Sequence, residues 1–600
     1  MHSALFNTTS MLKACSTMYI LYPIYAIVII RIMKYMQPFF FFIPYTCSIK
    51  FNCMRKAFPF FIISLFIISC SQNTSSSGDE ALNSFNRDSI KQNIKILASD
   101  SFEGRKPFSP GETKTVDYLQ HACINLGLEP GNGNSYLQDV PMVEITPTAD
   151  AVMKVQSLKG NFDLKRTDDF VVSTQNTDSA ISLNNDDLVF AGYGVVAPEY
   201  KWNDYAGINV KGKVVLVMVN DPGFGVDTSI FKGKTMTYYG RWTYKFEEAA
   251  RQGAKAVLII HNTEAASYPF SVVQNSWGSS NLYLDKKGDK QYHCALQGWV
   301  SADAAKKLLS AAGKDTSLLV SANKQGFKAV PLNEKLSLNV KVKAEYNTSH
   351  NVIAKIVGSK RPGEYVIYTA HWDHLGIGKP DEKGDSIYNG ALDNASGCAA
   401  LIEMARAFKN LKEKPERTIL FLAVTAEEQG LLGSEYYAEH PVYPLNKTVA
   451  DLNMDVVDAY DRKKDIVVTG EGQNELEDYV AEVAKQQDRY LAPEAHPEAG
   501  HYFRSDHFCF ARVGVPALDC KGGIDVVGKG KEYGKKLEDD YVQNHYHQPS
   551  DEYDSSWTFD GGIEDIQMLF LVGKKLANET SWPQWKQGSE FKAARDKMMQ

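Results

Sequence analysis

The chain has 600 residues, too many for a single hydrophobic core, and this length predicts at least two folding units. Its composition of 44% hydrophobic and 23% charged residues, with many Tyr and Phe, excludes a chain that is mostly disordered. The formal net charge is −7, and residues 1–69 hold six Lys or Arg and no Asp or Glu, so the remainder carries −13. This acidic remainder argues against a nucleic-acid partner, which would require a basic face.

Residues 54–70, MRKAFPFFIISLFIISC, have the layout of a bacterial lipoprotein signal. A Met and two basic residues precede an apolar run that is too short to span a membrane, and the run ends at Cys70. We expect a signal peptide at 54–69, a lipid on Cys70, and a polar tether at 70–85. The chain would then lie in the bacterial cell envelope, anchored to a membrane. The alternative is a plain signal anchor with an incidental cysteine.

Residues 1–53 contain a long apolar stretch that Arg31 and Lys34 interrupt. We interpret this segment as a non-native upstream extension, with translation starting at Met54. A membrane span is the alternative interpretation.

Five cysteines follow Cys70, and none of them forms a CxxC pair typical of a zinc ribbon. They are Cys123, Cys294, Cys398, Cys509 and Cys520. An oxidising compartment would permit a bond between Cys509 and Cys520, and buried free thiols are the alternative.

The pattern of apolar and polar residues changes twice along the rest of the chain. Apolar spacings of three and four predict helices within 86–130, and alternating strands follow, so 86–185 forms the first part of the main domain. From 186 to 344, short apolar runs punctuated by Gly, Asn and Pro indicate an inserted β-rich domain. From 345 to 600, strands alternate with long amphipathic helices, which is typical of an α/β domain.

Four apolar runs of this last region end in residues that can bind metal or carry protons. The residues at or just after these ends are His371, the pair Glu427 and Glu428, Asp455, and the pair Asp519 and Cys520. Nearly continuous apolar strands indicate a mostly parallel sheet flanked by helices on both faces. In such sheets the working crevice lies at the carboxyl ends of the strands. Three strands therefore deliver ligand-type residues to one edge.

Two further residues complete this set. Asp393 follows an Asn-Gly turn and opens an amphipathic helix, and His547 lies in a loop that ends at a proline. Adjacent carboxylates beyond a buried strand are costly unless a cation compensates them. A metal centre would supply that cation.

The segments AHWDH, GALDNASG, TAEEQGLLGS, LNMD, SDH with GVP, and YHQPSD occur in this order. This ordered set resembles the family-28 zinc metallopeptidases, which include bacterial leucyl aminopeptidases and glutamate carboxypeptidase. The resemblance covers about 345–580 and the helices of 86–130, and implies a zinc-dependent exopeptidase (phosphorylase/hydrolase-like) fold. The segment 186–344 resembles a protease-associated domain.

The resemblance implies two Zn²⁺ ions per chain, bridged by Asp393. His371 and Asp455 would complete one site, and Glu428 and His547 the other. Glu427 would act as general base on a metal-bridging hydroxide, and Asp373 would orient His371.

Other nearby residues have less distinctive patterns. His374 is expected to be a structural histidine rather than a ligand. Asp506 and His507 are expected to support the pocket wall. Tyr546 could stabilise an oxyanion, although aromatic packing is the simpler interpretation.

We expect an aminopeptidase that acts on peptides. A carboxypeptidase or dipeptidase on the same scaffold is the first alternative, and would need a basic anchor for which Arg504 is a candidate. A glutaminyl cyclase would keep a single zinc, and a receptor-like module would have lost ligands. The complete ligand set and Glu427 argue against both.

Overall fold

The computed structural model describes residues 77–225, 230–277, 279–287 and 292–600. The predicted extension, signal peptide and lipidated Cys70 lie outside the described residues. Within the described ranges, no helix combines the length and apolar character needed to cross a membrane.

The main sheet is built from four parallel strands in the order β17, β14, β18, β21. Their bounds are Arg417–Val424, Arg361–His371, Thr448–Asn453 and Ala517–Gly522. Antiparallel strands extend the sheet at both edges: the end of β13 (Val330–Ile356) pairs with β17, and β19 (Asp465–Val468) pairs with β21. The predicted mixed, mostly parallel sheet is therefore confirmed.

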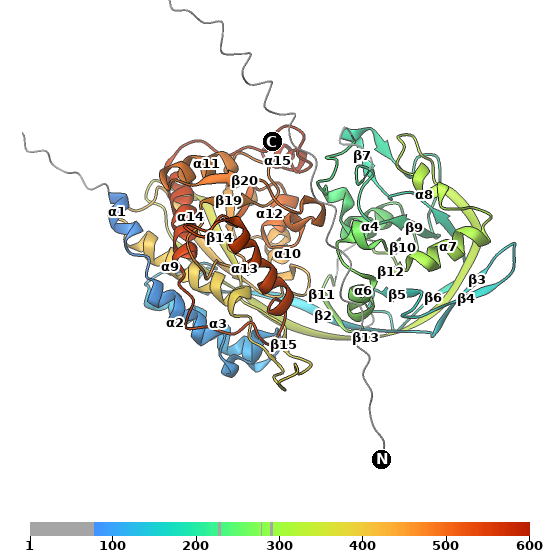
Figure 1. Cartoon of the computed structure of the whole chain (residues 1–600), viewed down its shortest axis with the longest axis horizontal. Coiled ribbons are helices and arrows are strands. Elements are labelled where there is room, and N and C mark those ends of the chain that lie inside the picture. Colours follow the sequence, from blue (N-terminus) through green and yellow to red (C-terminus); the bar gives the residue numbers. More distant parts are fainter. Residues whose placement is uncertain (1–76, 226–229, 278, 288–291) are drawn as a thin grey trace, which may run out of the picture. The chain divides into compact units, whose positions relative to one another are not determined.

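Helices cover both faces of this sheet because its strands alternate between two hydrophobic clusters. Residues Ile419, Phe421 and Ala423 of β17 face one cluster, and Leu420, Leu422 and Val424 face the other. The first face is covered by α2 (Arg87–Leu97), α3 (Pro110–Asn125), α9 (Gly397–Lys409), α11 (Leu476–Gln486) and α14 (Asp560–Asn578). The second is covered by α10 (Leu432–Glu439) and α12 (His507–Arg512). Figure 1 shows α9 and α14 beside β14.

The predicted helices of 86–130 are confirmed as α2 and α3. Asn86 caps α2 by accepting a hydrogen bond from the backbone N–H of Ser89. Ser109 caps α3, which has a proline in its first turn. Both helices follow from these local signals and from the apolar face that each buries.

A second core uses its own parallel sheet, in the order β6, β9, β10, β12, with β5 antiparallel at the edge. Their bounds are Ala180–Phe190, Val214–Met218, Ala256–Ile260, Leu296–Val300 and Phe170–Ser173. α4 (Trp242–Arg251) packs on one face and α7 (Ala302–Ala311) on the other. We call residues 149–340, which build this core, the insert. Its core already begins at Ala149, earlier than the predicted boundary at 186, because β3 (Val152–Gln156) and β6 both pair with β13.

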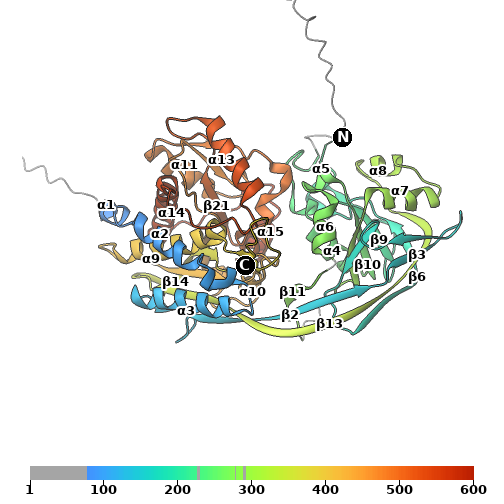
Figure 2. The same cartoon turned by 60° about the horizontal axis from the view of Figure 1, so that its bottom comes forward.

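The long strand β13 belongs to both sheets. Its first half pairs with β6, and its second half pairs with β2 (Leu137–Ala149) and then with β17. Figures 1 and 2 show β13 and β2 running together from the insert to the main sheet. The predicted boundary at 344 lies inside this continuous strand, so the two cores share a backbone ladder.

The remaining elements are short or peripheral. They are α1 (Ser77–Leu82), β1 (Glu129–Pro130), β4 (Phe162–Lys165), β7 (Val196–Ala197), β8 (Trp202–Asn203), α5 (Thr263–Ala266), α6 (Phe270–Ser276), β11 (Asn281–Leu284), α8 (Ser317–Ser321), β15 (Gly376–Ile377), β16 (Ile387–Tyr388), β20 (Tyr490–Ala492), α13 (Lys531–Asn544) and α15 (Lys592–Met598).

One inward position of β13 carries an acid. The strand alternates between buried and exposed residues, and Glu334 occupies the buried register between Leu332 and Leu336. Neither of its carboxylate oxygens has a hydrogen-bond partner in the described structure. Burial raises the pKa of Glu334 from 4.5 to about 8. An ionised carboxylate at this position therefore opposes folding.

Replacing Glu334 with Gln should stabilise the protein at neutral and alkaline pH. Between pH 4.5 and 8 the folded state binds more protons than the unfolded chain at this residue, so the free energy of unfolding falls as pH rises. In the Gln variant the free energy of unfolding does not fall with pH at this residue. It should therefore exceed that of the wild type by about 1–3 kcal/mol at pH 7.5. Unfolding midpoints measured from pH 5 to 8.5 test this prediction.

The matched control is Glu345→Gln, an exposed position of the same strand that should leave the pH slope unchanged. A Glu334→Gln variant with the wild-type pH slope would contradict the prediction.

Candidate metal centre

The carboxyl ends of β14, β17 and β18 converge on one site. His371 is the last residue of β14, Glu427 and Glu428 follow β17, and Asp455 follows β18. Asp393 lies in the helical turn that leads into α9, and His547 follows α13. Parallel strands end at the same edge, which is why segments far apart in sequence meet here.

Two groups of donor atoms share Asp393. Nε2 of His371 lies 3.2 Å from Oδ1 of Asp393 and 3.2 Å from Oδ1 of Asp455. Nε2 of His547 lies 3.1 Å from Oδ2 of Asp393 and 3.1 Å from Oε2 of Glu428. The structure therefore brings together all five predicted ligands, and the two oxygens of Asp393 face different groups.

The chemistry of this donor set fits bound cations. Nε2 of His371 lies within 4.0 Å of carboxylate oxygens of Asp393, Glu427 and Asp455, and the side chain of Glu428 is only 3% exposed. Burial opposes protonation of His547, but the carboxylates of Glu428 and Asp393 outweigh it and raise the pKa of this imidazole to about 10. Burial, with Asp455 and Glu428 nearby, raises the pKa of Glu427 well above its usual range. The raised pKa of His547 thus reflects surrounding negative charge that a divalent ion would neutralise.

His374, which the sequence analysis expected to be a structural histidine, lies close to the candidate metal centre. It is fully buried, and its Nδ1 lies 2.6 Å from Oε1 of Glu428. It also forms, with Asp393 and Glu428, a group whose donor atoms could hold an ion. The same carboxylate thus contacts His374 through one oxygen and His547 through the other.

Asp373 contacts the glutamate loop rather than the ring of His371. Its Oδ1 accepts a hydrogen bond from the backbone N–H of Glu427 at 3.0 Å, and its Oδ2 accepts one from Glu428 at 3.3 Å. Nδ1 of His371 lies 3.2 Å from the backbone oxygen of Asp373, and 3.8 Å from its carboxylate. The predicted orienting contact thus comes from the backbone, while the side chain positions both glutamates.

Asp551 holds the loop that carries Asp393, a role that the sequence analysis missed. It is 2% exposed and accepts hydrogen bonds at 3.1 Å from the backbone N–H groups of Leu392 and Asp393. It is the final residue of the YHQPSD segment, so the motif that supplied His547 also contained this signal.

Ser505 positions the Asp455 carboxylate. Its hydroxyl donates to Oδ2 of Asp455 at 2.7 Å and accepts from the side-chain amide of Asn453 at 2.7 Å. Ser505 is the first residue of the SDH segment, and the sequence analysis assigned roles only to Asp506 and His507 of that segment.

The other predicted side chains border the centre. Asp506 is fully buried and accepts from the Ser434 hydroxyl at 2.6 Å, and His507 is buried beside it. The ring of Tyr546 stacks on His547 with centroids 3.9 Å apart. Asp506 and His507 therefore lie in the wall, and Tyr546 packs aromatically against a candidate ligand.

The described cysteines are all free. Cys509 and Cys520 are both buried and unbonded, so the structure contains free thiols rather than the alternative disulfide.

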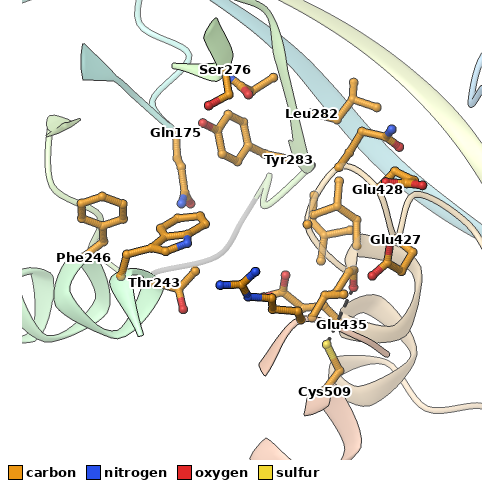
Figure 3. A pocket seen from close by; sticks show the side chains of 18 of the residues that line it. Gln175, Thr243, Phe246, Ser276, Leu282, Tyr283, Glu427, Glu428, Glu435 and Cys509 are labelled. Atoms are coloured by element: carbon orange, nitrogen blue, oxygen red, sulfur yellow. Dashed lines mark hydrogen bonds between the residues drawn. The ribbon is translucent and has the colours of Figure 1, made fainter. Parts of the chain in front are cut away.

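A cavity of about 1390 Å³ opens beside the centre, between the main sheet and the insert. Figure 3 shows Glu427 and Glu428 on one side of this space, with Gln175, Thr243 and Tyr283 of the insert opposite. The cavity is large enough for a short peptide, and the insert supplies part of its wall.

Residues 351–571 match the family model Peptidase family M28. We call residues 351–571 the M28 segment. The M28 segment contains β14, β17 and β18 and all five candidate ligands together with Glu427.

Curated relatives match parts of the chain. Aminopeptidase NAALADL1 of Rattus norvegicus is 26% identical over 45% of this chain and 38% of its own length. A probable zinc metalloprotease of Pyrenophora teres f. teres (strain 0-1) is 38% identical over 18% of this chain and 22% of its own length. The matches to these relatives thus cover less than half of each relative.

Solved structures are also similar over most of the chain. An aminopeptidase from Aneurinibacillus sp. strain AM-1 is 21% identical, with a TM-score of 0.47 over 84% of this chain and 97% of that one. A zinc aminopeptidase from Bacillus subtilis is 19% identical, with a TM-score of 0.41 over 85% and 99%.

Proposed function

We propose that the chain is a dinuclear zinc aminopeptidase that removes N-terminal residues from peptides. The observation that carries this proposal is the pair of donor groups that share Asp393, with Glu427 beside them and a peptide-sized cavity in front. Imidazole nitrogens and carboxylate oxygens are ligands that Zn²⁺ accepts. The M28 segment and the zinc metalloprotease relatives support the choice of metal.

Five side chains would hold the two ions. His371 and Asp455 would hold one, Glu428 and His547 the other, and Asp393 would offer one oxygen to each. When bound, a zinc pair lowers the pKa of an attacking water and polarises the scissile carbonyl.

Glu427, which is not among the proposed ligands, would transfer the proton of the attacking water. Its backbone N–H is held by Asp373, and its side chain lines the cavity rather than joining either donor group. Its carboxylate would accept a proton from the attacking water and return it to the nitrogen of the leaving amine. Asp373, Asp551 and Ser505 would keep Glu427, Asp393 and Asp455 in place.

The proposed activity is tested with the zinc-loaded mature protein and two substrate sets. Aminoacyl-nitroanilides should be hydrolysed, and dipeptides with a blocked N-terminus should not. Metal analysis of the same preparation should give two zinc ions per chain. Activity confined to the blocked set would indicate a carboxypeptidase instead, and one zinc per chain would favour a cyclase-like site.

We also propose that the native protein is anchored to a bacterial membrane by a lipid on Cys70. Mass spectrometry of the native N-terminus should find a modified cysteine as its first residue. An intact peptide from 1–53 would contradict this proposal.

A further inference from the structure

One strand beside the candidate metal centre has an edge that no other strand of the described structure pairs with. β11 pairs with β2 along one side, in antiparallel register. No described backbone group is hydrogen-bonded to its other side. All four residues of β11 line the same cavity as Glu427 and Glu428. β11 therefore borders the space in front of the proposed general base.

The register with β2 determines which backbone groups of β11 are unpaired. The backbone N–H of Asp285 donates to the backbone oxygen of Pro141 at 2.9 Å. In an antiparallel pair, residues that are hydrogen-bonded across the ladder alternate with residues that are not. Counting back from Asp285, Tyr283 directs its N–H and C=O groups toward β2. Leu282 and Leu284, on either side of it, direct theirs away from β2 and leave them free to bind another strand.

The two faces of β11 are covered by different parts of the molecule. Tyr283 faces the insert, where its hydroxyl lies 3.1 Å from the hydroxyl of Ser173 on β5. The buried side chains of Leu282 and Leu284 share a hydrophobic cluster with Ala426, which directly precedes the proposed general base. Figure 3 shows Leu282 and Tyr283 on opposite sides of this strand. Because β2 takes one edge and both faces are packed, the remaining edge is the part of the β11 backbone that is open to the cavity.

An ion pair fixes the end of β11. Lys286, just beyond the strand, has its Nζ 3.7 Å from Oε1 of Glu435 on α10. Pairing with β2, packing against Ala426 and this ion pair hold the strand from three sides. A peptide that pairs with β11 therefore does not have to order the strand first, which lowers the entropic cost of binding.

We infer that β11 binds the main chain of the peptide substrate as an added strand, through the N–H and C=O groups of Leu282 and Leu284. This inference rests on the proposed peptidase function. A peptide that adds to a strand edge gains its affinity from main-chain hydrogen bonds. Peptides with several residues beyond the scissile bond would reach β11, whereas an aminoacyl-nitroanilide has no residues that could pair with it. The insert, which contains β11, would thereby favour longer peptides.

Peptides with single N-methyl groups test the pairing on the wild-type enzyme. A hexapeptide amide that begins with Leu is compared with variants that carry one N-methyl group at the third, fourth, fifth or sixth residue. Only alternate residues of a strand direct their N–H groups to one neighbour. One position, or two positions separated by one residue, should therefore lose about tenfold in kcat/KM, and the others less than about twofold. Losses at consecutive positions, or at none, would overturn the inference.

Leu282→Pro tests the edge from the side of the enzyme. Proline removes an N–H that points away from β2, a position at which a strand tolerates it. The variant should lower kcat/KM for the hexapeptide about tenfold relative to kcat/KM for leucyl-nitroanilide. The control is Met142→Ala on β2, which shortens a side chain of the same hydrophobic cluster without changing the edge, and should leave this ratio within about twofold of wild type.

An unchanged ratio in a folded Leu282→Pro protein would contradict the inference, as would an equal fall of the ratio in Met142→Ala. Circular dichroism and the turnover of leucyl-nitroanilide report whether the proline variant is folded. If it is not folded, the N-methyl series on the wild type decides the question alone.

Binding to the Glu427→Gln protein distinguishes a failure of this inference from a failure of the proposed function. Calorimetric titration with the hexapeptide and its N-methyl variants measures strand pairing without turnover. The same alternating loss of affinity would support the pairing even if no substrate is hydrolysed. Equal affinities across the series, with leucyl-nitroanilide hydrolysed by the wild type, would refute the pairing and leave the proposed function intact.

Discussion

Replacing Glu427 with Gln should leave the zinc content at the wild-type level and reduce turnover at least a thousandfold. Gln has nearly the same shape and keeps the backbone hydrogen bond to Asp373, but its amide cannot accept the proton of the attacking water. Removing general-base assistance costs roughly 10²–10⁴ in rate. Steady-state kinetics, with metal analysis on the same sample, measure both quantities.

The matched control for this variant is Glu439→Gln. Glu439 lines the same cavity on α10 but lies outside both donor groups, so its turnover should stay within about twofold of wild type. A Glu427→Gln enzyme with full activity would remove Glu427 from the mechanism. A variant that lost its zinc would instead reveal Glu427 as a ligand.

Replacing Asp393 with Asn should reduce bound zinc to below one ion per chain and abolish measurable turnover. Asp393 is the residue whose two oxygens face both donor groups, at 3.2 Å from His371 and 3.1 Å from His547. Asn keeps a single carbonyl oxygen and loses the negative charge, so it cannot bind both ions and would bind either one more weakly. Metal analysis after dialysis measures the stoichiometry, and circular dichroism checks that the fold is retained.

The zinc content of Asp455→Asn is the most informative comparison for that of the Asp393→Asn variant. Asp455 contacts His371 but not His547, so its loss should remove about one ion and leave the other bound. The Asp393→Asn and Asp455→Asn variants are therefore expected to bind different numbers of zinc ions per chain. Two ions retained in Asp393→Asn would exclude a shared ligand at this position.

The pattern of the sequence anticipated the main sheet well, because each buried strand is a nearly continuous apolar run. β17 is buried along its whole length, and the sequence places two glutamates directly after it. The same reasoning placed His371 and Asp455 at one edge. Strand ends are local features, and parallel pairing converts them into neighbours without further information.

The contacts that hold these residues were not predictable in the same way. Asp551 contacts the backbone of Asp393, and Ser505 contacts Asp455 across 50 residues of sequence. Asp373 contacts the glutamate backbone where the family pattern suggested a ring contact. Hydrogen bonds depend on separations of a few tenths of an ångström, which no periodicity in the sequence encodes.

By itself the sequence determined the α/β class and the order of the segments that carry the candidate ligands, because these depend on residue type and on hydrophobic period. Only the tertiary structure decided that the second core begins at Ala149, that β13 serves both sheets, and that Arg241 and Arg504 share one cavity. The two arginines are 263 residues apart in sequence, and only Arg241 belongs to the insert. Both line one cavity because the insert and the main domain each contribute to its wall, which is a consequence of tertiary packing rather than of any local signal.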